Sequence, residues 1–166
     1  MAEVRRVTES KPIIAITMGD PAGIGPEVIA KALHNPEVAR LCKPLVIGDV
    51  RVFEDSRFAV PCALTPVMDV RALRDASLGP EGDGWILDLG VLDPETIKVG
   101  RVSPEAGRAA VESVIRAVEM AKAGEIDAIA TAPLHKEAMR LAGYEYIGHT
   151  ELLAELTKTA RCTTML

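Results

Sequence analysis

Three short apolar runs set the strongest constraint on how this chain folds. They are Ile13–Met18, Pro44–Gly48 and Ile126–Thr131. A continuous apolar run of this length is typical of a strand buried on both faces. Helical patterns separate the runs, so we expect a mainly parallel sheet with helices on both faces, a three-layer α/β/α fold in which all three runs are inner strands.

The helices between these runs have recognisable start signals. Ser103-Pro104-Glu105 offers a capping side chain, a proline for the first turn and an acidic residue, and it predicts a long helix that ends near Gly124. Pro26 predicts a helix start after the first run in the same way. We also expect a short helix capped by Asn35 and another over Val50–Phe58.

Weaker signals cover the other segments. Trp85–Leu89 predicts a strand, residues 60–73 one strand or two, and residues 90–102 an irregular segment or an edge hairpin. Cys162–Leu166 resembles the start of another strand. Residues 1–11 are polar, and we expect them to be flexible. We treat 1–166 as a single α/β unit.

Composition restricts the classes of binding partner and the cell compartment that we expect for this chain. A net charge of −5 argues against nucleic acid and anionic membranes, and no apolar run is long enough to span a membrane. The first residues lack the apolar core of a signal peptide. The three cysteines are an odd number without a Cys-x-x-Cys pair, so we expect reduced thiols in the cytoplasm.

A glycine loop, Gly19-Asp20-Pro21-Ala22-Gly23-Ile24-Gly25, joins the first run to its helix. Its glycines lack the Gly-x-Gly-x-x-Gly spacing of a dinucleotide-binding turn. Two interpretations stay open: the loop backbone approaches a ligand, or a tight turn requires glycine. Asp49, after the second run, is better explained as a helix cap than as a ribose-binding acid, because that fingerprint is absent.

The segment Gly148-His149-Thr150-Glu151 precedes another apolar helical pattern. A glycine, an imidazole and a hydroxyl at a helix start are suited to bind an anion, because unpaired backbone N–H groups point outward there. A simpler interpretation is that Thr150 caps the helix and His149 packs beside it. The spacing alone favours the simpler interpretation.

Three longer motifs show a resemblance to a known family. They are ITMGDPAGIGPE at 16–27, ATAPLHKEAMRLAG at 130–143 and YIGHTELLAELT at 146–157. The chain resembles the N-terminal half of the 4-hydroxythreonine-4-phosphate dehydrogenases of pyridoxal phosphate synthesis. The last motif is most similar to the branch that acts on D-threonate or D-erythronate 4-phosphate.

The resemblance implies an NAD-dependent oxidation, with loss of CO₂, of a phosphorylated hydroxy acid such as 4-phosphohydroxy-L-threonine. It also implies a fold like that of isocitrate and isopropylmalate dehydrogenases, NAD(P) and a divalent metal (Zn, Mg or Co) as cofactors, and a homodimer with its active site at the subunit contact. The family is about twice as long as this chain.

The family's substrate-binding pair falls on His149 and Thr150, and the resemblance therefore favours the anion-binding interpretation. It places Gly19, Asp20, Gly23 and Gly25 along the floor of the same cleft. Lys136 either reaches this cleft or is a solvated surface lysine.

The metal ligands of the family fall outside the matched residues. His34, His135 and His149 show no metal-ligand spacing with one another, so we assign neither metal ligands nor catalytic residues to this chain. We therefore expect the 166 residues alone to be inactive. The alternative to an enzyme half is a truncated module that acts in binding or assembly.

Overall fold

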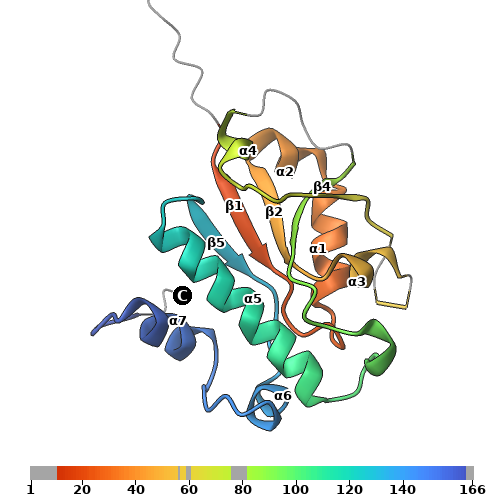
Figure 1. Cartoon of the computed structure of the whole chain (residues 1–166), viewed down its shortest axis with the longest axis vertical. Coiled ribbons are helices and arrows are strands. Elements are labelled where there is room, and N and C mark those ends of the chain that lie inside the picture. The colour runs from red at the N-terminus through yellow and green to blue at the C-terminus, as the bar shows by residue number, and fades with distance from the viewer. Residues whose placement is uncertain (1–10, 56, 59–60, 76–81, 164–166) are drawn as a thin grey trace, which may run out of the picture.

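A five-stranded sheet forms the centre of the computed structural model, which describes residues 11–55, 57–58, 61–75 and 82–163 (Figure 1). The strand order is β3-β4-β2-β1-β5, and every neighbouring pair is parallel. The strands are β1 Ile13–Thr17, β2 Lys43–Gly48, β3 Leu64–Pro66, β4 Gly84–Asp88 and β5 Ala128–Thr131. The predicted parallel sheet is confirmed.

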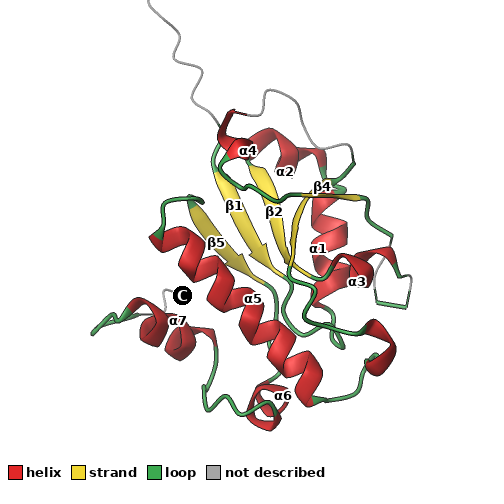
Figure 2. Ribbon diagram, viewed as in Figure 1, coloured by secondary structure: helices red, strands yellow, loops and turns green. Residues whose placement is uncertain are grey.

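Helices connect the strands, as parallel pairing requires (Figure 2). Those before β4 are α1 Gly25–Leu33, α2 Pro36–Leu41, α3 Val50–Glu54 and α4 Ala72–Asp75. Those after β4 are the 3₁₀ turn η1 Pro94–Thr96, α5 Pro104–Lys122, α6 Lys136–Leu141 and α7 His149–Thr157. The predicted caps are in place: Asn35 accepts from the N–H of Glu37 at 3.0 Å, and Ser103 accepts from that of Ala106 at 3.2 Å.

The two faces of the sheet pack against different helices. Val46 and Ile86 face α1 and α3, where Ile29 and Phe53 are buried. On the other face, the alternate positions of the strands pack against the C-terminal half of α5 and against α4. This gives the three-layer α/β/α fold that the sequence predicted. The outer side of α5 packs in turn against α6 and α7.

The predicted inner position of Ile126–Thr131 is wrong. Among the described residues, β5 pairs only with β1 and forms one edge of the sheet. Ala128, Ala130 and Thr131 are exposed, and only Ile129 is half-buried within the strand. Small apolar residues suit an edge as well as a core, and a local run carries no information on which strands pair.

Of three weaker predictions, the first is wrong, the second is confirmed and the third lies mostly outside the described residues. The helix predicted over Val50–Phe58 ends at Glu54, because Asp55 is extended. Residues 60–73 contain only one described strand, β3, and the start of α4. Of Cys162–Leu166, the first two residues are irregular and the rest lie outside the described residues, as do residues 1–10.

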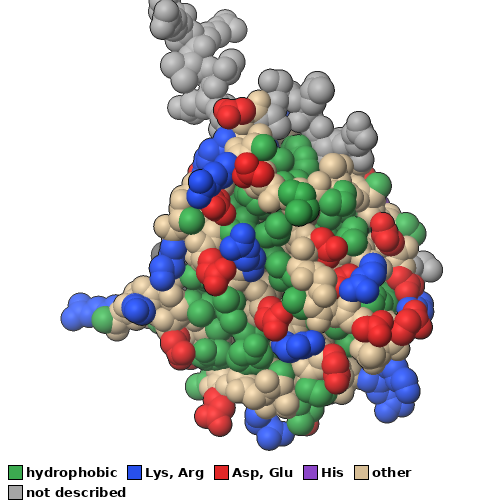
Figure 3. Space-filling view, viewed as in Figure 1, with side chains coloured by type: hydrophobic (Ala, Val, Ile, Leu, Met, Phe, Trp, Pro, Cys, Tyr) green, Lys and Arg blue, Asp and Glu red, His purple; other side chains and the backbone are tan. Residues whose placement is uncertain are grey.

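Acidic and basic side chains are interspersed over the face of the molecule shown in Figure 3, with apolar areas between them. The net charge of −5 is therefore not gathered in one area of this face. Within the described ranges, no helix has both the length and the apolar character needed to cross a membrane.

Candidate functional site

Ala132, the first residue after β5, is the point at which the candidate site residues meet. It is buried, and its N–H donates to the carbonyl oxygen of Thr17 at 3.2 Å, which joins the ends of β5 and β1. Both strands present their carboxyl ends here. In open α/β sheets, ligands bind at this edge.

The glycine loop after β1 packs directly on the segment after β5. Gly19 has φ +70°, and a Cβ at this position would lie 2.5 Å from the carbonyl oxygen of Pro133. The N–H of Asp20 donates to the same oxygen at 2.9 Å. A Cβ on Gly25 would lie 2.5 Å from the carbonyl oxygen of Met18. These close approaches are to the chain's own backbone, so the turn interpretation accounts for Gly19 and Gly25.

Gly23 differs from these two glycines. A Cβ there would meet its nearest atom, the carbonyl oxygen of Asp20, at 3.4 Å, and the residue is exposed. The carboxylate of Asp20 accepts from the N–H of Ala22 at 2.8 Å and holds the loop in a turn. Gly23 is therefore exposed and has room for a Cβ, but its N–H already donates to the carbonyl oxygen of Asp20 at 3.0 Å.

Two buried polar side-chain atoms in the described part of the chain have no hydrogen-bond partner: Thr17 Oγ1 and His149 Nε2. Both lie beside Ala132. The backbone carbonyl of Thr17 accepts from the N–H of Ala132, and the Ala132 backbone is close enough to the imidazole of His149 to affect its pKa. Buried polar atoms are nearly always paired, so the unpartnered Nε2 of His149 indicates a position that a ligand or a water would satisfy.

Burial shifts the pKa values of two groups here. It lowers the pKa of His149 below its ordinary value, while the backbone of Ala132 acts in the opposite direction. It raises the pKa of Asp20, against the effects of the Ala22 N–H and of His135. His149 is therefore a neutral imidazole at neutral pH, able to donate from one nitrogen and accept at the other.

The start of α7 supplies the backbone part of the site. Gly148 is the N-cap, without a side-chain hydrogen bond, so the interpretation of Thr150 as the cap is wrong. Thr150 is the second residue of α7 and is exposed. The first N–H groups of this helix lack intrahelical partners and favour an anion.

The segment after β5 ends in α6, which begins at Lys136. His135 caps this helix by accepting from the N–H of Ala138 at 3.4 Å, and both His135 and Lys136 are exposed. Gly107 allows α6 to lie against α5, because a Cβ on it would lie 2.1 Å from the carbonyl oxygen of Ala138. Lys136 is thereby held on the segment that leaves Ala132, but none of its described contacts joins it to His149.

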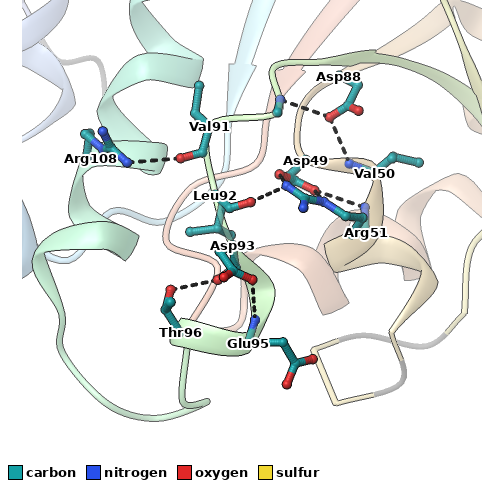
Figure 4. Close-up of polar contacts among 11 residues, drawn as sticks. Asp49, Val50, Arg51, Asp88, Val91, Leu92, Asp93, Glu95, Thr96 and Arg108 are labelled. Carbon is teal, nitrogen blue, oxygen red and sulfur yellow. Dashed lines mark hydrogen bonds and ion pairs between the residues drawn. The ribbon is translucent and has the colours of Figure 1, made fainter.

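Asp49 lies at the same edge of the sheet, where it contacts Arg51 (Figure 4). Its buried carboxylate caps α3 through the N–H of Arg51 at 3.1 Å and pairs with that residue's guanidinium at 2.7 Å. The guanidinium also donates to the carbonyl oxygen of Leu92. These bonds occupy the carboxylate, which agrees with the predicted cap and leaves little capacity for a ribose.

The described residues at this edge do not fit the divalent metal that the resemblance implies. No three His, Cys, Asp or Glu side chains converge here within the described chain, so we derive no step through a metal ion at this place. The one such group in the described residues is His34, Cys62 and Asp83. The loop after β1 lacks the dinucleotide spacing, and Asp49 is occupied.

Comparison with known proteins identifies the family of the chain. The sequence model of the family described as "Pyridoxal phosphate biosynthetic protein PdxA" matches residues 40–166. The chain belongs to the PdxA family. A protein of Clostridium botulinum named "Putative D-threonate 4-phosphate dehydrogenase" is 43% identical over 158 residues, which are 94% of this chain and 46% of the relative. A protein of the same name from Oceanobacillus iheyensis is 45% identical over 157 residues.

Solved structures of PdxA-family proteins share the fold. The crystal structure of 4-hydroxythreonine-4-phosphate dehydrogenase from Klebsiella pneumoniae superposes with a TM-score of 0.79 at 38% identity, over 90% of this chain and 46% of that one. The sequence resemblance to this family is confirmed. The chain spans about half the length of the relatives that it matches.

Sequence reasoning singled out the loop, His149 and Thr150 as candidates, but not Thr17 or Ala132. Both belong to apolar segments, and nothing in a local pattern separates a strand-end threonine from any other strand residue. Only the pairing of β1 with β5 brings them together.

Proposed function

We propose that this chain forms the part of a PdxA-family dehydrogenase that binds the anionic groups of a phosphorylated hydroxy acid. The observation that carries the proposal is the buried Nε2 atom of His149, which lacks a partner beside Ala132. A ligand oxygen at this atom would satisfy it. The position is also that of the substrate-binding pair in the resembling family.

Each binding group has a separate task. Neutral His149 gives a directional hydrogen bond to an oxygen, and the hydroxyl of Thr150 both donates and accepts. The free N–H groups of α7 attract a phosphate or carboxylate. Lys136 adds a positive charge on the adjoining segment, while Asp20 keeps the loop in shape.

The proposed reaction of the whole protein is the NAD(P)-dependent oxidation of the hydroxy acid with loss of CO₂. A divalent metal, a homodimer and a cytoplasmic location are part of the same proposal and come from the family resemblance. To this chain we assign substrate binding and orientation, and no contact with the catalytic metal. The 166 residues alone are therefore expected to be inactive.

Two substrates are compatible with the family. The curated relatives named for D-threonate 4-phosphate are 43–45% identical to this chain, whereas the solved structure named for 4-hydroxythreonine 4-phosphate is 38% identical. We therefore propose D-threonate 4-phosphate as the substrate, ahead of 4-phosphohydroxy-L-threonine.

The test is a steady-state assay of the full-length protein with each substrate, NAD and a divalent metal, with NADH formation as the readout. We expect the higher kcat/KM with D-threonate 4-phosphate. A preference for 4-phosphohydroxy-L-threonine would refute the choice of substrate. If no NADH forms with either substrate, the proposed dehydrogenase activity is refuted. The 166-residue chain is assayed in parallel, and NADH from it above a heat-treated control would overturn its assignment to binding alone.

A further inference from the structure

A second group of side chains lies at the opposite edge of the sheet from Ala132. His34 follows α1 as its C-cap, Cys62 lies just before β3, and Asp83 lies just before β4. α1 begins near the end of β1 and ends near the starts of β3 and β4. The group is therefore remote from the proposed substrate site.

The fold brings these three segments together through two glycines. A Cβ on Gly82 would lie 2.4 Å from the carbonyl oxygen of Ala63, and one on Gly84 would lie 3.4 Å from the methyl groups of Leu33. The N–H of Asp83 donates to the Ala63 carbonyl oxygen at 2.8 Å, and the Asp83 carboxylate accepts from the N–H of Ala63 at 2.9 Å. The backbone thus fixes the carboxylate beside Cys62.

We propose that His34, Cys62 and Asp83 bind a Zn²⁺ ion. Their ligand atoms all lie within 4.8 Å of one another, and Nε2 of His34 is 3.4 Å from Oδ2 of Asp83. Ligands on a tetrahedral zinc ion lie about 3.3–3.8 Å apart, given bond lengths of about 2.0–2.3 Å. The His–Asp pair already has this spacing, and the thiol reaches it by a movement of roughly 1 Å or less.

The chemical types of the three side chains indicate which metal ion the group would bind. Thiolate, imidazole and carboxylate together suit zinc, whereas magnesium and calcium prefer oxygen ligands alone. The His34 and Asp83 side chains are 39% and 31% exposed, so water can reach the ion and fill the fourth position. Cys62 is buried, and burial next to Asp83 raises the pKa of its thiol to about 12, so the ion must displace the thiol proton to water when it binds.

The bound ion would link the end of α1 to the segments that enter β3 and β4. A ligand that binds only the folded state stabilises that state. Because the group lies away from Ala132, we assign the ion a structural role. This inference does not rest on the proposed function.

The test is zinc binding by the full chain without a histidine tag, in competition with a chromophoric chelator, together with its thermal midpoint. We expect one zinc per chain and a higher midpoint with zinc. Co²⁺ in place of zinc should give sulfur-to-cobalt charge-transfer absorption. Asp83→Asn retains an acceptor for the Ala63 N–H, and His34→Ala removes an exposed ring, so we expect both variants to fold. Each should bind zinc at least about 10-fold more weakly than the unaltered chain.

Cys62→Ser should abolish the cobalt absorption, whereas Cys162→Ser, which changes an exposed thiol, should leave it intact. Absence of zinc binding by the unaltered chain would overturn the proposal. Unchanged zinc affinity in both His34→Ala and Asp83→Asn would overturn it as well. So would cobalt absorption that persists in Cys62→Ser.

Discussion

The N–H of Asp20 donates a 2.9 Å hydrogen bond to the carbonyl oxygen of Pro133. This bond joins the turn after β1 to the turn after β5, two segments more than a hundred positions apart in the chain. It fixes the glycine loop on the segment that leads to Lys136. The candidate site therefore depends on a backbone contact that only Gly19 permits.

Gly19→Ala should lower the free energy of unfolding by about 2 kcal/mol or more. The substitution strains a backbone with φ +70° and places a Cβ 2.5 Å from the Pro133 oxygen. Urea unfolding measures the loss. Gly100→Ala is the matched control, because Gly100 has φ +75° and no atom within 4 Å of a Cβ, so only the strain of about 1 kcal/mol applies. Equal losses in the two variants would contradict the close contact.

We predict that Asp49 stabilises the folded state and does not bind the nucleotide. Asp49→Ala removes the cap of α3 and the partner of Arg51, and should lower the free energy of unfolding by about 1–3 kcal/mol. Asp49→Asn retains a cap acceptor and should lose less. Denaturant unfolding of both variants measures this, and the NAD affinity of the full-length variants is measured beside it. Weaker NAD binding with unchanged stability would show that the carboxylate binds the cofactor instead.

The sequence predicted the elements better than their arrangement. The apolar runs of β1 and β2 and the Ser103 start of α5 are local signals with local causes, and all three are confirmed. The edge position of β5 depends on strand pairing, which no local pattern records. The orphaned Thr17 hydroxyl and the group at His34 arise for the same reason, from residues far apart in the chain that meet only after folding.

Burial of His149 should make the folded state less stable in acid. Its folded pKa lies below the ordinary 6.5, so between the two values the unfolded state binds more protons and stability falls as the pH drops. Asp20, whose pKa is raised, acts in the opposite sense: its contribution becomes more favourable as the pH falls through its folded pKa.

Urea unfolding of the unaltered chain and of His149→Gln, at about pH 7.5 and about pH 5.5, isolates the histidine. The other titrating groups are common to both proteins, so they cancel in the comparison. We expect the unaltered chain to lose more stability between the two pH values than the variant does. The same loss in both proteins would mean that the imidazole is not buried as described.

The most direct test of the substrate site is the dissociation constant of D-threonate 4-phosphate for the full-length protein, measured by calorimetry for the unaltered form, His149→Ala and Leu41→Ala. Leu41 is the control, because its side chain is exposed at the end of α2, at the opposite edge of the sheet. Loss of a hydrogen bond to a charged group should weaken binding by about 10- to 150-fold in His149→Ala. Leu41→Ala should bind as the unaltered protein does. Unchanged affinity in His149→Ala, or an equal loss in both variants, would contradict the assignment of the substrate site to His149.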